Sequence, residues 1–168
     1  MYFYLIRHAQ PDYHAPVPYH LPPGPGLTET GLEQAAALVP MLQHSGIERI
    51  VSSPLRRCTM TAAPLAAALG LDVMIDDDLR DVKPGDPQLD TTVRMLRAAL
   101  AQSDKRVVAL VSHAAPLTWL MQSLTHDEVV LPAKDRRGNH LSESMVWGVF
   151  IRRGRWTARH LLPQGTVC

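Results

Sequence analysis

Short apolar segments alternate with amphipathic segments along most of the chain, and this alternation constrains the fold more than any other feature. Apolar runs rich in β-forming residues predict strands over residues 2–6, 47–51, 71–75 and 107–111. Apolar residues at helical spacing predict helices over residues 28–46, 52–69, 91–101 and 116–124. Strict alternation of strand and helix indicates an α/β fold, a three-layer sandwich with a mostly parallel, doubly wound sheet and helices on both faces.

A closing strand pair and a long loop complete this pattern. Residues 145–151 and 156–162 have the composition of two strands joined by a turn at Arg153-Gly154. Six prolines fall within residues 11–26, a density that forbids a regular element and predicts a loop at the rim of the site. The 168 residues suffice for one sizeable core and are too few for two ordinary domains, so we expect a single domain over residues 1–168.

Composition argues against several classes of partner. The formal net charge is +1, so we expect no overall electrostatic attraction to nucleic acid or to an anionic membrane. No stretch reaches the roughly 18 apolar residues that a membrane span needs, and we expect a soluble, cytoplasmic protein. The two cysteines and the scattered histidines lack the spacing of metal ligands, so the sequence predicts no metal and no cofactor.

Polar residues that follow the predicted strands form the candidate site. In open α/β sheets, ligands bind beyond the carboxyl ends of the strands. Applied to this chain, the rule selects eight residues: Arg7, His8, Ser52, Ser53, Arg56, Arg57, Asp81 and His113.

Each cluster of these residues, taken alone, has an ordinary explanation. Arg7 and His8 could form a solvated strand end, and His113 could be a packed histidine. Arg56 and Arg57 stand in the first turn of a helix, where acids are preferred, and indicate either a bound anion or salt bridges elsewhere. Together the three clusters favour an anion site.

Four sequence blocks carry a resemblance to a known family. Arg7-His8-Ala9 resembles an Arg-His-Gly motif, and Leu27-Thr28-Glu29-Thr30-Gly31-Leu32-Glu33-Gln34-Ala35 resembles a Leu-Thr-x-x-Gly-x-x-Gln-Ala segment. Ser53-Pro54-Leu55-Arg56-Arg57-Cys58-Thr59-Met60-Thr61-Ala62 resembles Ser-Pro-Leu-x-Arg-Ala-x-x-Thr-Ala, and Val111-Ser112-His113-Ala114-Ala115 resembles Val-Ser-His-Gly-Gly. In this order, the blocks are similar to the motifs of the histidine phosphatase superfamily, which includes phosphoglycerate mutases.

The resemblance implies a role for each matching residue. It makes His8 the nucleophile and places Arg7, Arg57 and His113 around the phosphate of the substrate, with His113 also counted among the catalytic residues. His14 stands seven residues after the motif arginine, where many members have Asn, and is expected to bind phosphate.

The proton donor is implied by a shorter match. The family has Glu in a Leu-x-Glu context after the third strand, and Leu79-Arg80-Asp81 takes that place here. Asp81 is therefore expected to be the general acid, although its side chain is one methylene shorter than that of Glu. Asp86 and Asp78 remain alternatives.

The function expected from these residues is a metal-independent phosphatase that hydrolyses phosphomonoesters through a phosphohistidine intermediate on His8. Its substrate would be a small phosphorylated molecule or a phosphoprotein. Only 31 residues separate Asp81 from His113, which leaves no room for the helical insertions that roof the site in larger members. The alternatives are a phosphohistidine phosphatase acting on a protein, a phosphoglycerate-type mutase and a non-catalytic phosphate-binding module.

Overall fold

The computed structural model describes residues 1–161, which form a six-stranded sheet in the order β3-β2-β4-β1-β5-β6. Of its five pairings, those of β1 with β4, β4 with β2 and β2 with β3 are parallel. The pairings of β1 with β5 and of β5 with β6 are antiparallel. The strands are β1 (Tyr2–Arg7), β2 (Arg49–Ser52), β3 (Val73–Ile75), β4 (Val107–Ser112), β5 (Val146–Arg152) and β6 (Arg155–Leu161). The predicted mostly parallel sheet is confirmed, and the last residue of the predicted strand 156–162 lies outside the described residues.

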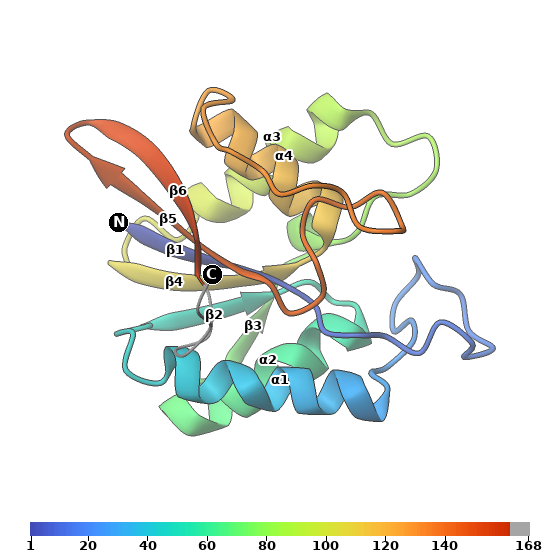
Figure 1. Cartoon of the computed structure of the whole chain (residues 1–168). Coiled ribbons are helices and arrows are strands. Elements are labelled where there is room, and N and C mark those ends of the chain that lie inside the picture. The colour runs from blue at the N-terminus through green and yellow to red at the C-terminus, as the bar shows by residue number, and fades with distance from the viewer. Residues whose placement is uncertain (162–168) are drawn as a thin grey trace.

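Helices cover both faces of the sheet, as Figure 1 shows: α1 and α2 lie on one face, and α3 and α4 lie on the other. They are α1 (Glu29–Leu42), α2 (Arg56–Leu69), α3 (Gln88–Leu100) and α4 (Ala114–Leu124), with a short 3-10 helix η1 (Asp77–Leu79) before α3. Two hydrophobic cores follow from this arrangement, one on each side of the sheet. The predicted three-layer sandwich is therefore confirmed.

The helix boundaries agree with their sequence signals at most ends. The Thr28 hydroxyl caps α1 by accepting a hydrogen bond from the Gly31 amide at 3.0 Å, and α2 ends at Gly70 in the left-handed conformation with φ of 65°. One expectation is wrong: the helix predicted over residues 52–69 does not begin at residue 52, because α2 begins at Arg56. Leu55 remains extended, with its side chain fully buried, and delays the helix start.

Strand register places the candidate site at one edge of the sheet. Arg7 at the end of β1 lies opposite Ser112 at the end of β4, and Ser52 at the end of β2 lies opposite Val111. The residues that follow these three strands therefore meet. The proline-rich loop 11–26 leaves the sheet at the same edge, on the right of Figure 1.

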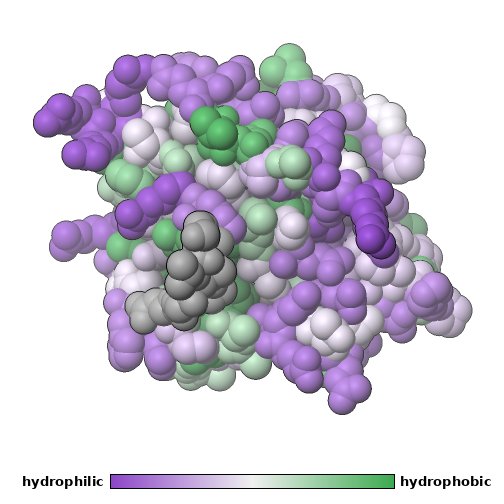
Figure 2. Space-filling view, viewed as in Figure 1, coloured by the Kyte–Doolittle hydropathy of each residue, from purple (hydrophilic) through white to green (hydrophobic). Residues whose placement is uncertain are grey.

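The surface contrasts with the buried cores. Figure 2 shows a face that is mostly hydrophilic, with hydrophobic residues in small separate areas. Among the residues that the structure describes, none of the helices is both long and apolar enough to cross a membrane.

Candidate active site

His8 lies at the end of β1 with only 2% of its surface exposed. Its Nδ1 atom is 2.8 Å from the carbonyl oxygen of Ala9. Because a carbonyl oxygen can only accept, Nδ1 carries the proton and donates it, and the lone pair of the neutral ring is on Nε2. The backbone amide of His8 donates to the Ser112 carbonyl at 3.0 Å, which anchors the residue to β4.

His113, the residue before α4, packs against His8 in an edge-to-face arrangement with 5.1 Å between ring centroids. Its Nε2 atom is 3.0 Å from the Ser53 hydroxyl, and its Nδ1 atom is 3.3 Å from a guanidinium nitrogen of Arg57. Since Arg57 can only donate, the neutral His113 ring accepts at Nδ1 and donates from Nε2 to Ser53.

Both histidines are neutral near neutral pH in this environment. Burial, followed by the charges of Arg57 and Arg7, holds the pKa of His8 well below its usual range, despite the opposing hydrogen bond to Ala9. Burial, then His8 and Arg57, lowers the pKa of His113 in the same way. Burial therefore disfavours the protonated form of His113, although the Asp81 carboxylate lies 3.6 Å from its Nδ1 atom.

The two arginines are buried beneath the site. Arg7 is 4% exposed and donates to the Leu141 carbonyl, with the Asp135 carboxylate 3.5 Å away. Arg57 is fully buried and donates to the Tyr19 carbonyl at 2.8 Å. Among the described residues, the Nε atoms of both arginines are buried and have no hydrogen-bond partner. Buried donors of this kind are costly unless an acceptor reaches them.

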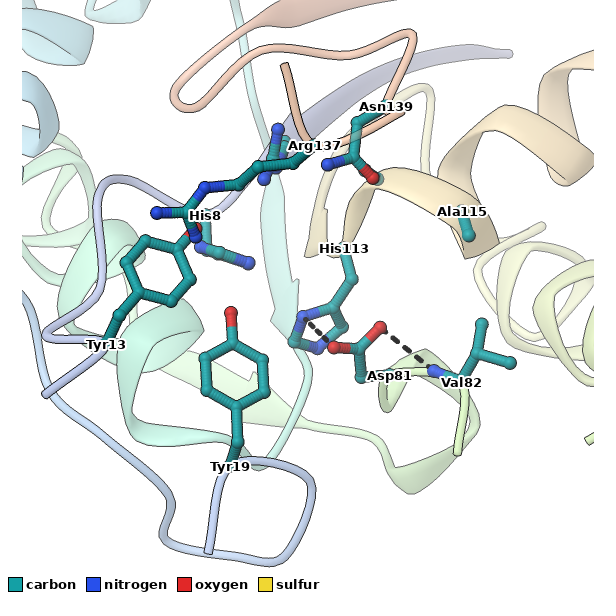
Figure 3. Close-up of a pocket in the computed structure, with 11 residues that line it drawn as sticks. His8, Tyr13, Tyr19, Asp81, Val82, His113, Ala115, Arg137 and Asn139 are labelled. Atoms are coloured by element: carbon teal, nitrogen blue, oxygen red, sulfur yellow. Dashed lines mark hydrogen bonds and ion pairs between the residues drawn. The ribbon is translucent and has the colours of Figure 1, made fainter. Parts of the chain in front are cut away.

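The Asp81 carboxylate lies beside Arg57 and His113. One of its carboxylate oxygens is 2.9 Å from Arg57 and 3.6 Å from Nδ1 of His20. The same oxygen is 3.6 Å from Nδ1 of His113, a contact that Figure 3 shows. The two alternative acids are engaged elsewhere: Asp78 forms an ion pair with Arg97, and Asp86 accepts a hydrogen bond from the Lys83 amide. Of the three carboxylates expected from the sequence, Asp81 lines the cavity above His8.

That cavity has a volume of about 310 Å³ and opens between two loops. Tyr13 and Tyr19 of the proline-rich loop line it and stack on each other with 5.7 Å between ring centroids. Tyr13 and Tyr19 thus place the proline-rich loop at the wall of this cavity. His14 is exposed and does not line the cavity, so the structure does not bring it together with His8 and Arg7.

Arg57 and the start of α2 are held from the same loop. The guanidinium of Arg57 lies 4.1 Å from the centre of the Tyr19 ring and does not itself line the cavity wall. At the helix start, the Arg56 amide donates to the Pro23 carbonyl at 2.6 Å. A backbone carbonyl, rather than an anion, therefore satisfies the first amide of α2.

The opposite wall comes from residues that the sequence did not single out. Arg137 and Asn139 belong to the segment 125–145 between α4 and β5 and line the cavity. In Figure 3, Arg137 reaches toward Tyr13, and its guanidinium lies 3.4 Å from the centre of that ring. A basic pair in an irregular segment, Arg136-Arg137, is the only sequence signal for this contact.

The second sequence block positions the chain just after His8. The Gln10 amide donates to the Gln34 side chain at 2.8 Å, and the Thr28 hydroxyl donates to the Gln10 side chain at 2.8 Å. A Cβ atom at Gly31 would lie 2.2 Å from the Gln10 carbonyl oxygen, so only glycine fits there. The block thus packs α1 against the segment that carries His8.

The third block has a similar positioning contact. The Thr61 hydroxyl accepts a hydrogen bond from the Ala9 amide at 2.9 Å and donates to the Arg57 carbonyl at 2.6 Å. Ala9 is fully buried, and the methyl of Ala114 lies at the cavity wall. The residues described in the structure contain no group of three or more His, Cys, Asp or Glu side chains that could hold a metal ion.

Comparison with known sequences identifies relatives of this chain. The sequence model of the histidine phosphatase superfamily (branch 1) matches residues 3–94. The uncharacterised protein Rv0525 of Mycobacterium tuberculosis is 31% identical over 156 residues, covering 73% of this chain and 77% of that protein. The bifunctional protein Rv2228c of Mycobacterium tuberculosis is 43% identical over 76 residues, which are 45% of this chain but only 21% of that protein.

Comparison with solved structures supports the fold. A mycobacterial glucosyl-3-phosphoglycerate phosphatase, solved with VO3, superimposes with a TM-score of 0.75 at 24% sequence identity. The alignment covers 95% of this chain and 97% of that protein. The similarity extends over the whole three-layer architecture.

Proposed function

Because the chain belongs to the histidine phosphatase superfamily, we propose that it hydrolyses phosphomonoesters of small molecules through a phosphohistidine intermediate on His8. The superfamily and its structural neighbours include phosphatases. A neighbour of the same fold that is a glucosyl-3-phosphoglycerate phosphatase supports a small phosphorylated substrate.

One observation carries the nucleophile assignment. The hydrogen bond from Nδ1 of His8 to Ala9 leaves a neutral ring whose lone pair is on Nε2, and this is the form that attacks phosphorus. Burial and two arginines keep the pKa of His8 low, so the attacking form is present at neutral pH.

The buried arginines supply the charge that a phosphate dianion requires. A phosphomonoester repels nucleophiles until its charge is neutralised. The unpartnered Nε donor of Arg7, which lines the cavity, fits a phosphate oxygen, which accepts such a bond with short, charge-assisted geometry. The buried Arg57 adds positive charge from behind the cavity wall. His113 completes the polar surface of the pocket, and its Nε2 atom lies 3.0 Å from the buried Ser53 hydroxyl.

The reaction then follows in two steps. Nε2 of His8 forms a bond to phosphorus as the bond to the leaving oxygen breaks, and that oxygen takes a proton from the Asp81 carboxyl group. Water next attacks the phosphohistidine and gives a proton back to Asp81, while the phosphorus–nitrogen bond breaks and inorganic phosphate leaves.

The test is replacement of the nucleophile. His8→Ala should lower turnover of p-nitrophenyl phosphate by more than about 10²-fold, and quenched wild-type protein should carry an acid-labile, base-stable phosphate. His44→Ala, at an exposed position away from the cavity, is the matched control and should retain wild-type turnover. A His8→Ala variant that keeps a tenth of wild-type activity would remove His8 as the nucleophile.

The same assay tests whether a metal takes part. The proposed site neutralises phosphate with arginine and histidine side chains, so activity should survive exhaustive chelation. Loss of activity on chelation, restored by a divalent ion, would contradict this part of the proposal.

A further inference from the structure

A second cavity of about 390 Å³ adjoins the one above His8. Both cavities are lined by Ala114, Ala115 and Asn139, so they lie next to each other at the start of α4. The volume of the second cavity falls within the range of small-molecule sites.

The second cavity follows one face of α4. Its lining includes Ala115, Thr118, Trp119 and Gln122, which are spaced by three, four and seven residues and therefore share a helix face. Seven residues of helix rise by about 10 Å, so the cavity extends by about that length from the phosphate pocket. A leaving group attached to a phosphate at His8 can reach along it.

The lining of this cavity is polar, and its formal charge is positive. Lys134 is the only Lys, Arg, Asp or Glu among the described residues that line it. Gln88, Gln122 and Asn139 offer amide groups that pair with hydroxyls, and Trp119 offers a partly exposed ring. The Nδ1 atom of His140 donates to the Pro132 carbonyl at 2.7 Å, which leaves Nε2 as an acceptor when the ring is neutral.

We propose that the second cavity binds the alcohol part of the substrate, and that this part carries hydroxyls and a second anionic group that pairs with Lys134. This inference rests on the proposed phosphatase activity, since the phosphate end must lie at His8. The second anionic group is a carboxylate or a phosphate, which Lys134 binds by the same charge pairing.

A matched set of linear six-carbon substrates tests the inference: glucitol phosphate, phosphogluconate and glucitol bisphosphate. Wild-type kcat/KM should be about tenfold higher for phosphogluconate, glucitol bisphosphate or both than for glucitol phosphate. This ratio of kcat/KM values should fall as ionic strength rises. If the second anionic group of the natural substrate is a carboxylate, the protein should prefer phosphogluconate. If it is a phosphate, the protein should prefer glucitol bisphosphate.

The variants are Lys134→Met and Lys134→Arg, with Lys105→Met as the control. Lys134→Met should bring the ratio of kcat/KM values close to one, whereas Lys134→Arg should retain most of the preference. Lys105→Met should leave the ratio unchanged, because Lys105 lies outside both cavities. Lys134 is exposed, so these changes leave the core intact.

The outcomes separate this inference from the phosphatase proposal. Failure of wild-type protein to hydrolyse p-nitrophenyl phosphate and all three esters would overturn both. Hydrolysis without preference, or a preference that Lys134→Met retains, would overturn the inference alone. A phosphoserine peptide hydrolysed faster than the three esters, with no dependence on Lys134, would also overturn it.

Discussion

The cavity has a floor and a rim that are built in different ways. The floor consists of Arg7, His8 and His113, with Arg57 buried behind them, and none of the four is more than 4% exposed. The rim consists of loop residues that include Tyr13, Tyr19 and Arg137. Backbone hydrogen bonds between neighbouring strands hold the floor, whereas ring stacking holds the rim. A buried floor preserves one geometry for phosphate chemistry, and an exposed rim can change without disturbing it.

Asp81 joins the two regions, and its replacement gives the largest expected effect. Asp81→Asn should lower kcat for an alkyl phosphate by about 10²–10⁴-fold, because an alkoxide leaving group requires a proton. The effect on p-nitrophenyl phosphate should be much smaller, since its leaving group is weakly basic. Single-turnover rates on both esters measure the difference.

Asp86→Asn is the matched control, because Asp86 interacts with Lys83 outside the cavity and its loss should affect both esters equally. Equal losses for both esters in Asp81→Asn would contradict the assignment of Asp81 as the leaving-group acid. Asp81 would then belong to the floor only as the partner of Arg57.

Gly31→Ala tests how tightly α1 packs against the segment that follows His8. The added methyl would lie 2.2 Å from the Gln10 carbonyl oxygen, so α1 must shift. We expect a loss of about 1–3 kcal/mol in the free energy of unfolding, measured by urea denaturation. Glu33→Ala, at an exposed position of the same helix, should change stability by less than about 0.5 kcal/mol. Equal stabilities for the two variants would show that the contact with Gln10 is adaptable.

The pH dependence of stability reports on the two floor histidines. Their pKa values are lower in the folded protein than in the unfolded chain, so below about pH 6.5 the unfolded chain binds more protons and the free energy of unfolding decreases. Each histidine contributes a slope of up to about 1.4 kcal/mol per pH unit, until its folded-state pKa is reached.

Unfolding of wild type and His8→Asn over this pH range measures the contribution of His8. The variant should show the smaller slope, and His44→Asn should keep the wild-type slope. A slope unchanged by His8→Asn would mean that the pKa of His8 is the same in the folded protein as in the unfolded chain, which would contradict the effect of burial.

Substitution of a rim residue should have the smallest effect on activity and stability. Tyr13→Phe removes a hydrogen bond of 2.8 Å to Glu143 and keeps the stacking on Tyr19 and Arg137. We expect a loss of about 0.5–1.5 kcal/mol in stability and a change of kcat for p-nitrophenyl phosphate of less than about threefold. A loss of kcat as large as that of a floor variant would show that the rim is as important for catalysis as the floor.

The sequence alone predicts the fold and the floor. Alternating strands and helices imply a parallel sheet, and the carboxyl ends of parallel strands share an edge, so residues after β1, β2 and β4 must meet. Arg7, His8, Arg57 and His113 follow directly from that rule and from the motifs around them. The same rule placed Asp81 near them, because it follows β3 and η1 at the same edge.

The tertiary structure alone decided which loop residues complete the site. His14 was expected at the phosphate and is exposed, while Arg137, Asn139 and Lys134 were not expected and line the two cavities. Strands and helices have a periodicity that fixes where each side chain points, so their ends can be located from sequence. An irregular segment has none, and its path depends on long-range contacts such as those of Leu141 and Asp135 with Arg7.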